Sequence, residues 1–372
     1  MDKQLSKTFK VITVLLVLSY FLPCCWSQNF ALTYQLSDVP GGSEYYQLNV
    51  SVSQSLYDYY VSSTHTLFSI RDFPTFVTPY IMMPVADKLW EIYSIEEDFA
   101  NGVLMIVHQI PYVETLPVKY PVETIVANEG DCDLFSCLAA SILKAAGFNV
   151  VLLYYEDEAH MNVGVHLQQR PQLSREQAYY VTHNNVRYYV AECTGDDWRI
   201  GECPDLLKQS SPQVITLENS NPQEPGQVSA SYESLESSAL SLLVSPSLSI
   251  QGSTVTVSGT LNPPLNNRNV TIFLKSNNSP WTILAVVMTE SNGRFTYLWK
   301  ADVSGVNHFR AGWSGDNNHA GADSQVQTLF AFSFFFILLL AVVGVLICLG
   351  VIVLFMSHQS QPDIPQPPEI PY

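Results

Sequence analysis

Positive charge is scarce in this chain. Among 372 residues, 17 are Lys or Arg and 34 are Asp or Glu, which gives a formal net charge of −17 at pH 7. Proteins that bind DNA or RNA neutralise phosphates with clustered Lys and Arg side chains. We therefore predict no nucleic-acid partner. An acidic composition of this kind suits a soluble exterior surface.

The usual metal-binding motifs are missing as well. No two histidines have the i, i+4 spacing of a helical zinc site, and no Cys-x-x-Cys pair occurs. There is also no acidic loop of the Asp-x-Asp-x-Asp-Gly type, so a calcium requirement is not expected. We predict no metal and no cofactor. A metal set formed by His160, His166 and Glu192 is the alternative.

Cysteine is sparse between the two hydrophobic ends of the chain. Of seven cysteines, two lie beside the N-terminal apolar stretch and one lies in the C-terminal apolar stretch. The other four are Cys132, Cys137, Cys193 and Cys203. Cys193 and Cys203 could close a small disulfide next to Glu192, or could stay reduced in a compartment that is not strongly oxidising.

One of these cysteines begins a predicted helix. Cys132 follows Gly130-Asp131, and apolar residues then recur at three- and four-residue spacing over 134–146, up to Gly147. Asp131 is the expected N-cap, and Gly147 is expected just after the C-cap. In the first turn of a helix, free N–H groups and the positive end of the dipole stabilise a thiolate. Cys132 is therefore a candidate nucleophile, and its amide is a candidate oxyanion donor.

Three strands are predicted after this helix, over residues 148–155, 160–167 and 188–194. The second strand begins with His160, and the third contains Glu192. Neighbouring antiparallel strands would hold these two side chains next to each other on one face of a sheet. A helix packed on that sheet would bring Cys132 to His160.

A thiol, an imidazole and a carboxylate are the groups that thiol-based acyl transfer needs. His160 would take the thiol proton, Glu192 would orient the imidazole, and Cys132 would attack a carbonyl carbon. Each residue also has a plainer interpretation when it is considered alone. Cys132 is then a buried, inert cysteine, and His160 is a polar residue at a strand end. Glu192 is then a surface carboxylate whose role Asp196 or Asp197 could take.

Taken together, residues 86–202 resemble the transglutaminase-like superfamily, which includes the papain-like cysteine peptidases. The matching segments are Tyr120-Pro121-Val122-Glu123-Thr124 before Gly130-Asp131-Cys132, then His160-Met161-Asn162-Val163-Gly164-Val165, and then 188–194, with 95–111 as the preceding helix. The resemblance implies that Cys132 is the nucleophile, His160 the general base and acid, and Glu192 the orienting acid. The superfamily most often has Asp in the third role. Glu is one methylene longer and still accepts an imidazole N–H bond.

The resemblance also implies an α+β fold in which a Cys-headed helix packs on an antiparallel sheet. Residues 245–328 have a different pattern, with strand-like runs at 253–261, 269–275, 281–289, 294–301 and 306–313. This pattern predicts an all-β sandwich. Segments 293–299 and 311–316 resemble the Ig-like domains of prokaryotic surface proteins, and Trp299 and Trp313 are expected in the core.

Both ends of the chain carry apolar stretches. Three lysines precede the apolar residues 11–22, which predicts a secretory signal. Residues 329–356 contain no charged side chain, and at about 1.5 Å per residue they can cross a hydrocarbon core of roughly 30 Å. The predicted organisation is a signal peptide at 1–27, an N-terminal extension at 28–85, a transglutaminase-like domain at 86–207, a linker at 208–244, an Ig-like sandwich at 245–328, a transmembrane helix at 329–356 and a cytoplasmic tail at 357–372.

These features predict a single-pass protein of the cell membrane with an extracellular thiol enzyme that acts on the amide bonds of a protein or peptide substrate. A transglutaminase, with an amine in place of water as acceptor, would use the same three residues. The hypothesis from another class is a catalytically inactive surface protein for binding or adhesion, built on the same fold.

Overall fold

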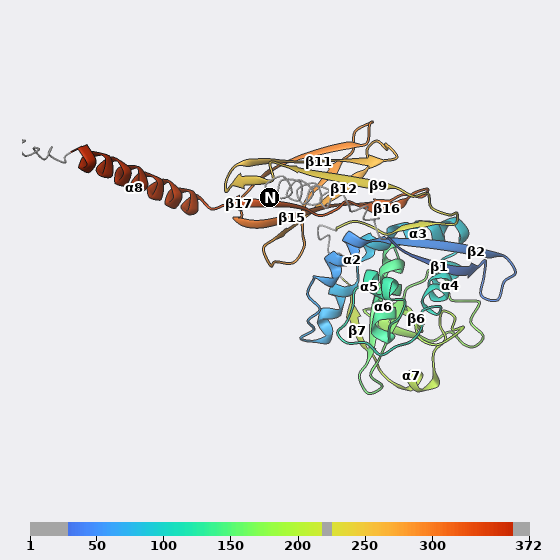
Figure 1. The fold of residues 1–372 in the computed structure, drawn as a ribbon. Helices are drawn as coiled ribbons and strands as arrows, with labels where there is room; N and C mark the ends of the chain where they lie inside the picture. Colours follow the sequence, from blue (N-terminus) through green and yellow to red (C-terminus); the bar gives the residue numbers. More distant parts are fainter. Residues whose placement is uncertain (1–28, 218–224, 360–372) are drawn as a thin grey trace, which may run out of the picture.

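The computed structural model describes residues 29–217 and 225–359. The predicted signal peptide, 1–27, lies outside the described residues, as do positions 360–372 of the predicted tail. Two folded units lie side by side, and one long helix projects away from them (Figure 1). The chain is of the mixed α+β class that the sequence predicts, with several antiparallel sheets and one apolar C-terminal helix.

The first unit is built on a five-stranded antiparallel sheet. Its strands follow the order β5 (Tyr180–His183), β6 (Val186–Ala191), β4 (His160–Val165), β3 (Val150–Tyr155) and β7 (Gln213–Thr216). Asn184 and Asn185 both have positive φ and form the tight turn between β5 and β6. Successive side chains of a strand point to opposite faces. Leu152 therefore joins the main core, while Leu153 joins a smaller core on the other face.

Helix α6 (Cys132–Ala145) is the central helix of this unit. It packs against β3 and β4 and against the helices α3 (Pro79–Ile92), α4 (Glu96–Val107) and α5 (Pro121–Ala127). Every residue from 134 to 143 is buried. The helix ends in a Schellman motif, because the Phe148 and Gly147 N–H groups donate to the Leu143 and Lys144 carbonyls, both at 3.1 Å. Gly147 therefore has the predicted position, with φ +91°.

The predicted N-terminal extension shares its core with α6. It forms a hairpin of β1 (Asn29–Ser37) and β2 (Tyr45–Ser53), followed by α2 (Gln54–Val61) and the 3-10 helix η1 (Ile70–Phe76). Leu48 and Val50 of β2 belong to the same buried cluster as Leu138 of α6. Helix α3 also runs across the predicted boundary between 85 and 86. The extension and the predicted core are thus one folded unit.

The predicted linker at 208–244 needs correction. Its strand β7 is an edge strand of the core sheet, β8 (Ser229–Ser231) pairs with β2, and β9 (Ala239–Ser245) belongs to the second unit. The short helix α7 (Asp205–Gln209) precedes them. The Ser- and Pro-rich composition indicates a linker, but three short pairings with distant strands satisfy the backbone of this segment instead.

The second unit consists of two sheets that enclose one hydrophobic core. The smaller sheet has the order β14 (Arg294–Lys300), β11 (Thr254–Asn262) and β9, and the larger has the order β10 (Leu248–Ile250), β17 (Gln327–Phe332), β15 (Gly305–Gly315), β12 (Asn269–Ser276) and β13 (Thr282–Met288), with β16 (Ala320–Asp323) paired to β15. Trp299 and Trp313 are both buried in the core between the sheets. This confirms the position predicted for the two side chains.

Charged side chains connect the two units. Arg310 of β15 forms an ion pair with Asp58 of α2, with 2.6 Å between Nη1 and Oδ2, and the Arg310 side chain is only 7% exposed. The Arg310 guanidinium also lies over the Trp281 ring. Nearby, the Ser55 N–H donates to the Asp323 carboxylate at 3.0 Å. These contacts fix the second unit against the N-terminal part of the first.

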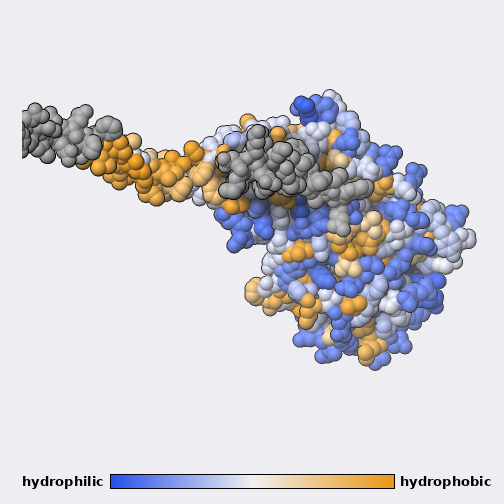
Figure 2. Space-filling model, in the orientation of Figure 1, coloured by the Kyte–Doolittle hydropathy of each residue, from blue (hydrophilic) through white to orange (hydrophobic). Residues whose placement is uncertain are grey.

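The C-terminal helix α8 (Phe334–Gln359) contains a segment, Phe334–Leu354, that is long and apolar enough to cross a membrane. Its surface is continuously apolar, whereas the visible face of the two units is mainly hydrophilic (Figure 2). The predicted start at 329 needs correction, because Leu329 and Ala331 are buried core residues of β17. Residues 329–356 form one apolar run, in which the alternation of inward and outward side chains that marks a strand cannot be recognised. The sequence therefore did not distinguish the end of β17 from the start of α8.

Candidate active site

Cys132 lies at the start of α6, half-buried, on the wall of a cleft of about 590 Å³. The cleft is formed by the segment before α6, the first turn of α6, and the turn that leads into β4. Its lining residues are Phe73, Tyr112, Glu114, Thr115, Leu116, Asp131, Cys132, Asp133, Tyr154, Ala159, His160 and Met161. Two of the three predicted site residues, Cys132 and His160, thus face the same cleft.

The third predicted residue contacts His160 from behind. His160 Nε2 lies 3.2 Å from both carboxylate oxygens of Glu192, whose side chain is only 1% exposed. Cys132 lies close enough to the imidazole to contribute to its raised pKa. Because Nε2 is engaged by the carboxylate, Nδ1 is the ring nitrogen left for the thiol. The structure therefore brings Cys132, His160 and Glu192 together in one row, with the imidazole in the middle.

Strand register explains this arrangement. In the pairing of β4 with β6, Val163 is opposite Ala191, so the next positions outward place Asn162 opposite Glu192. Met161 and Val163 pack in the same core as α6, which leaves His160 and Asn162 on the other face of the strand with Glu192. Helix α6 is tied to this strand by the Ser136 hydroxyl, which donates to the Met161 carbonyl at 2.9 Å.

Two polar neighbours of Glu192 were not predicted. The Asn162 amide donates to Glu192 Oε2 at 3.0 Å, and the Thr194 N–H and hydroxyl donate to Oε1 at 3.0 and 2.6 Å. Together with His160, they satisfy the buried carboxylate. A signal was available, because Asn162 and Thr194 each lie two residues from a site residue within the predicted strands 160–167 and 188–194, although β6 ends at Ala191 in the structure.

The environment keeps His160 protonated at neutral pH. Burial by itself lowers the pKa of His160, since the charged imidazolium loses solvation. Hydrogen bonds to Cys132 and Glu192 oppose that effect and prevail, which raises the pKa of His160 to about 10. Burial also disfavours ionised Glu192, but its bonds with His160 and Thr194 hold the pKa of that carboxyl below its usual range. The imidazolium is therefore the form that faces Cys132.

The start of α6 differs in one detail from the expectation. Asp131 occupies the N-cap position, but its side chain makes no capping bond and instead accepts from the Thr115 N–H at 2.8 Å. A Cβ on Gly130 would lie 2.9 Å from the Phe135 ring, so the glycine is required by packing against the helix. The Cys132 N–H is in the first turn, where an α-helix supplies no acceptor, and it stays a candidate oxyanion donor.

A pair of carboxyl groups flanks the thiol. Burial, reinforced by a hydrogen bond with Asp131 and by the charge of Asp131, raises the pKa of Asp133 to about 8. Asp133 therefore holds its proton at neutral pH. The pair keeps a second negative charge away from Cys132 until the solution becomes alkaline.

This proton makes a pH-dependent contribution to stability. The folded chain keeps it between about pH 4 and 8 while the unfolded chain releases it, so the contribution of Asp133 to stability falls as pH rises over that range. We expect Asp133→Asn to raise the unfolding midpoint at pH 8, by roughly 2–4 °C for each 1 kcal/mol recovered, and to change it little at pH 4. Thermal unfolding in micelles measures both. Equal shifts at the two pH values would contradict the prediction, and Asp205→Asn, at an 87% exposed carboxylate, is the control.

The other candidates lie elsewhere. His166 is a half-buried residue whose Nδ1 contacts the Arg187 carbonyl, and Asp197 pairs with Arg175 rather than with His160. Cys193 and Cys203 are both free and buried, in hydrophobic clusters on different faces of the sheet. Over residues 29–217 and 225–359, no group of three or more His, Cys, Asp or Glu residues is arranged to hold a metal ion.

No protein-family model matches the chain, and no curated protein matches its sequence. Among solved structures, red sea bream transglutaminase is 9% identical with a TM-score of 0.21, over 82% of this chain and 63% of that chain. A tetra-tandem repeat from the extending region of a large adhesion protein is 12% identical with a TM-score of 0.21, over 49% and 42%. The human F-spondin reeler domain is 16% identical with a TM-score of 0.20, over 25% and 88%. TM-scores at this level assign the chain to none of these folds.

Proposed function

We propose that this chain is a membrane-anchored thiol enzyme that transfers the acyl group of a peptide or protein amide through Cys132, His160 and Glu192. The observation that carries the proposal is the position of His160, which lines the same cleft as the half-buried Cys132 and contacts the buried Glu192 carboxylate through Nε2. A buried imidazole with this pair of partners is the arrangement expected of a nucleophile, its base and an orienting acid.

The proposed reaction has two halves. The Cys132 sulfur, as thiolate, attacks the amide carbonyl carbon, and the Cys132 N–H at the start of α6 stabilises the oxyanion. His160 then gives its proton to the departing amine as the C–N bond breaks, which leaves a thioester on Cys132. Water or a primary amine attacks the thioester and passes its proton to His160. The thiolate leaves, and a carboxylic acid or a new amide is released.

The proposal extends to the architecture. A Cys-headed helix packed on an antiparallel sheet, with Cys, His and Glu in that order, supports a transglutaminase-like core. The two-sheet unit beside it supports an Ig-like domain that holds the core away from the membrane. Helix α8 would then be the membrane anchor, with the two folded units outside the cell and residues 357–372 inside. Its substrates would be proteins or peptides at that surface.

Trapping the thioester tests this function. The full chain in detergent micelles is incubated with glutamine-containing peptides and with simple peptide amides, and Cys132 is examined by mass spectrometry. We expect a mass increase equal to the acyl group on Cys132, no increase in Cys132→Ser, and an unchanged increase in the control His166→Ala. Adding a fluorescent primary amine separates the two acceptors, because labelled product forms only if an amine replaces water.

The absence of an adduct from every donor, in a chain whose Cys132 is present and reduced, would overturn the proposal. The remaining candidate would then be a surface binding or adhesion protein on the same fold. The choice of donors follows from the charge of the cleft. The carboxylates of Glu114 and Asp131 line it, so peptides with Lys or Arg near the reacting amide should react faster than acidic ones.

A further inference from the structure

A second cavity, of about 420 Å³, shares no lining residue with the cleft at Cys132. Its walls are the end of β1, the turn from β1 to β2, the second half of α4, and the segment that follows Glu192. A cavity of this size is within the range of small-molecule sites, roughly 300–1,000 Å³. The reaction proposed above uses none of its residues.

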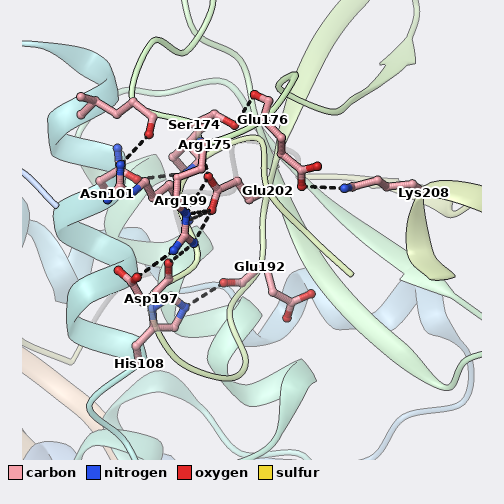
Figure 3. A network of polar contacts seen from close by, with 12 residues as sticks. Asn101, His108, Ser174, Arg175, Glu176, Glu192, Asp197, Arg199, Glu202 and Lys208 are labelled. Carbon is pink, nitrogen blue, oxygen red and sulfur yellow. Dashed lines mark hydrogen bonds and ion pairs between the residues drawn. The ribbon is translucent and has the colours of Figure 1, made fainter. Parts of the chain in front are cut away.

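The walls of this cavity hold Glu192 in place. His108, a lining residue, lies 2.9 Å through Nε2 from the Glu192 carbonyl oxygen. Because a carbonyl oxygen only accepts, Nε2 carries the proton. The same segment that holds Glu192 Oε1 through Thr194 continues to Asp197 and Trp198, which line the cavity. Figure 3 shows His108 beside Glu192, and Arg175 between Asp197 and Glu202.

One buried polar group in the cavity wall has an unmet donor. Asn101 is only 1% exposed, and its Oδ1 accepts from the Ile200 N–H at 3.0 Å. Its Nδ2 has no hydrogen-bond partner within the described part of the chain. A buried amide donor without an acceptor is unfavourable, since water is lost and nothing replaces it. A ligand oxygen placed in the cavity would supply that acceptor.

The remaining lining selects a neutral ligand with an apolar face. The Asp197 carboxylate is paired with Arg175 at 2.9 Å, and burial lowers the pKa of His108, which keeps the imidazole neutral. Among the described residues that line the cavity there is no Lys or Arg. Trp198 and Tyr45 provide aromatic surface, and Gln35, Ser37 and Gln109 provide polar groups nearby.

Aromatic faces beside amide and hydroxyl groups suit sugar rings, whose C–H faces pack on the aromatic rings while their oxygens accept and donate hydrogen bonds. We propose that this cavity binds a neutral sugar of one or two rings, with an oxygen on Asn101 Nδ2, and that occupation steadies Glu192 through His108 and the 194–198 segment. Sugar binding is independent of the acyl-transfer proposal. Only the effect on Glu192 rests on that proposed site.

Binding is measured on the full chain in micelles of a detergent without a sugar headgroup. The probes are N-acetylglucosamine, its β-1,4-linked dimer, maltose and, as an acidic control, galacturonate. We expect saturable binding of at least one neutral probe by calorimetry, weakened at least tenfold by Trp198→Ala and by Asn101→Asp. Tyr180→Ala replaces a comparably accessible tyrosine outside both cavities and should leave binding unchanged. Cys132→Ser should also bind normally, which separates this test from that of acyl transfer.

The link to Glu192 is read from the alkylation rate of Cys132. A bound probe should change that rate at least twofold in the wild type and not in Trp198→Ala. The variants keep the fold if their unfolding midpoints lie within a few degrees of the wild-type midpoint. The control variant Tyr180→Ala is measured in the same way for comparison. The proposed sugar site is wrong if no neutral probe binds. It is also wrong if a probe binds equally well to the wild type, to Trp198→Ala and to Asn101→Asp. Binding with an unchanged alkylation rate overturns the link to Glu192.

Discussion

Replacing His160 with alanine will slow the alkylation of Cys132 at pH 6 by about 100-fold or more. An ordinary cysteine with a pKa of ~8.5 is almost entirely protonated at pH 6, and only the thiolate reacts. In this protein the pKa of His160 is raised to about 10. The imidazolium therefore persists beside the sulfur across the neutral range and stabilises the thiolate. Without it, the thiol loses its neighbouring positive charge.

The pH profile makes this prediction specific. In the wild type, we expect the rate of iodoacetamide reaction at pH 6 to be a larger fraction of the rate at pH 9 than it is in His160→Ala, because the imidazolium is lost only near pH 10. In His160→Ala, the rate should rise steeply with pH over the same range. Glu192→Gln should give an intermediate profile, since removing the carboxylate removes one of the groups that raise the pKa of His160. Mass spectrometry of the alkylated chain identifies the labelled residue.

The other cysteines of the folded units interfere little. Cys137, Cys193 and Cys203 are buried, and burial raises the pKa of each thiol, for Cys203 to about 12. His166→Ala is the matched control, because it removes a half-buried histidine outside the cleft that contacts the Arg187 carbonyl and the Tyr188 ring. A wild-type thiol that reacts slowly at pH 6, with a rate indifferent to His160, would contradict the nucleophile and base assignment.

Asp58→Ala will destabilise the chain by about 3 kcal/mol, because it leaves a buried guanidinium without its carboxylate. Arg310 is 7% exposed on its side chain, and its Nε and Nη2 atoms have no hydrogen-bond partner among the described residues. The Asp58 contact at 2.6 Å is thus its hydrogen-bonded ion pair, beside the face of Trp281 and the charge of the nearby Asp323 carboxyl group. Thermal or denaturant unfolding of the full chain in micelles measures the loss.

Two further variants separate charge from packing. In Asp58→Leu with Arg310→Met, both charges are removed together, and we expect most of the lost stability to return, since a buried ion pair is often replaceable by apolar residues. Asp205→Asn breaks a pair with Lys208 whose carboxylate is 87% exposed, and should cost 0–1 kcal/mol at most. If Asp58→Ala lowers the free energy of unfolding no more than Asp205→Asn does, the prediction is wrong, because the ion pair between the units would then be accessible to water.

Local sequence patterns predicted the elements that carry the candidate site. The three- and four-residue spacing of apolar side chains placed α6, and Gly147 placed its end. Short apolar runs placed β3, β4 and β6. These predictions succeeded because each depends on neighbours within one or two turns or on the two-residue alternation of a strand. The same alternation could have added Asn162 and Thr194 to the site.

Features that depend on partners distant in sequence could not be predicted from local patterns. The Ser- and Pro-rich linker segment allows a short strand at 214–217, which corresponds to β7, but β8 and the distant partners of both strands had no local signal. Leu329 and Ala331 were assigned to the membrane helix because an apolar run is compatible with a buried strand as well. His108 had no sequence signal, because its role depends on a carbonyl 84 residues away.

The sequence by itself determined which groups were available and where along the chain they sit: a thiol at a helix start, an imidazole at a strand start, a carboxylate in the next predicted strand and an apolar C-terminal helix. Tertiary structure decided which of them meet. Register between β4 and β6 set Glu192 beside His160, the segment after β6 carries Asp197 to Arg175, and tertiary packing placed the first turn of α6 and the start of β4 on the wall of one cleft. Contacts of this kind depend on the position of whole elements, which no local spacing of residues specifies.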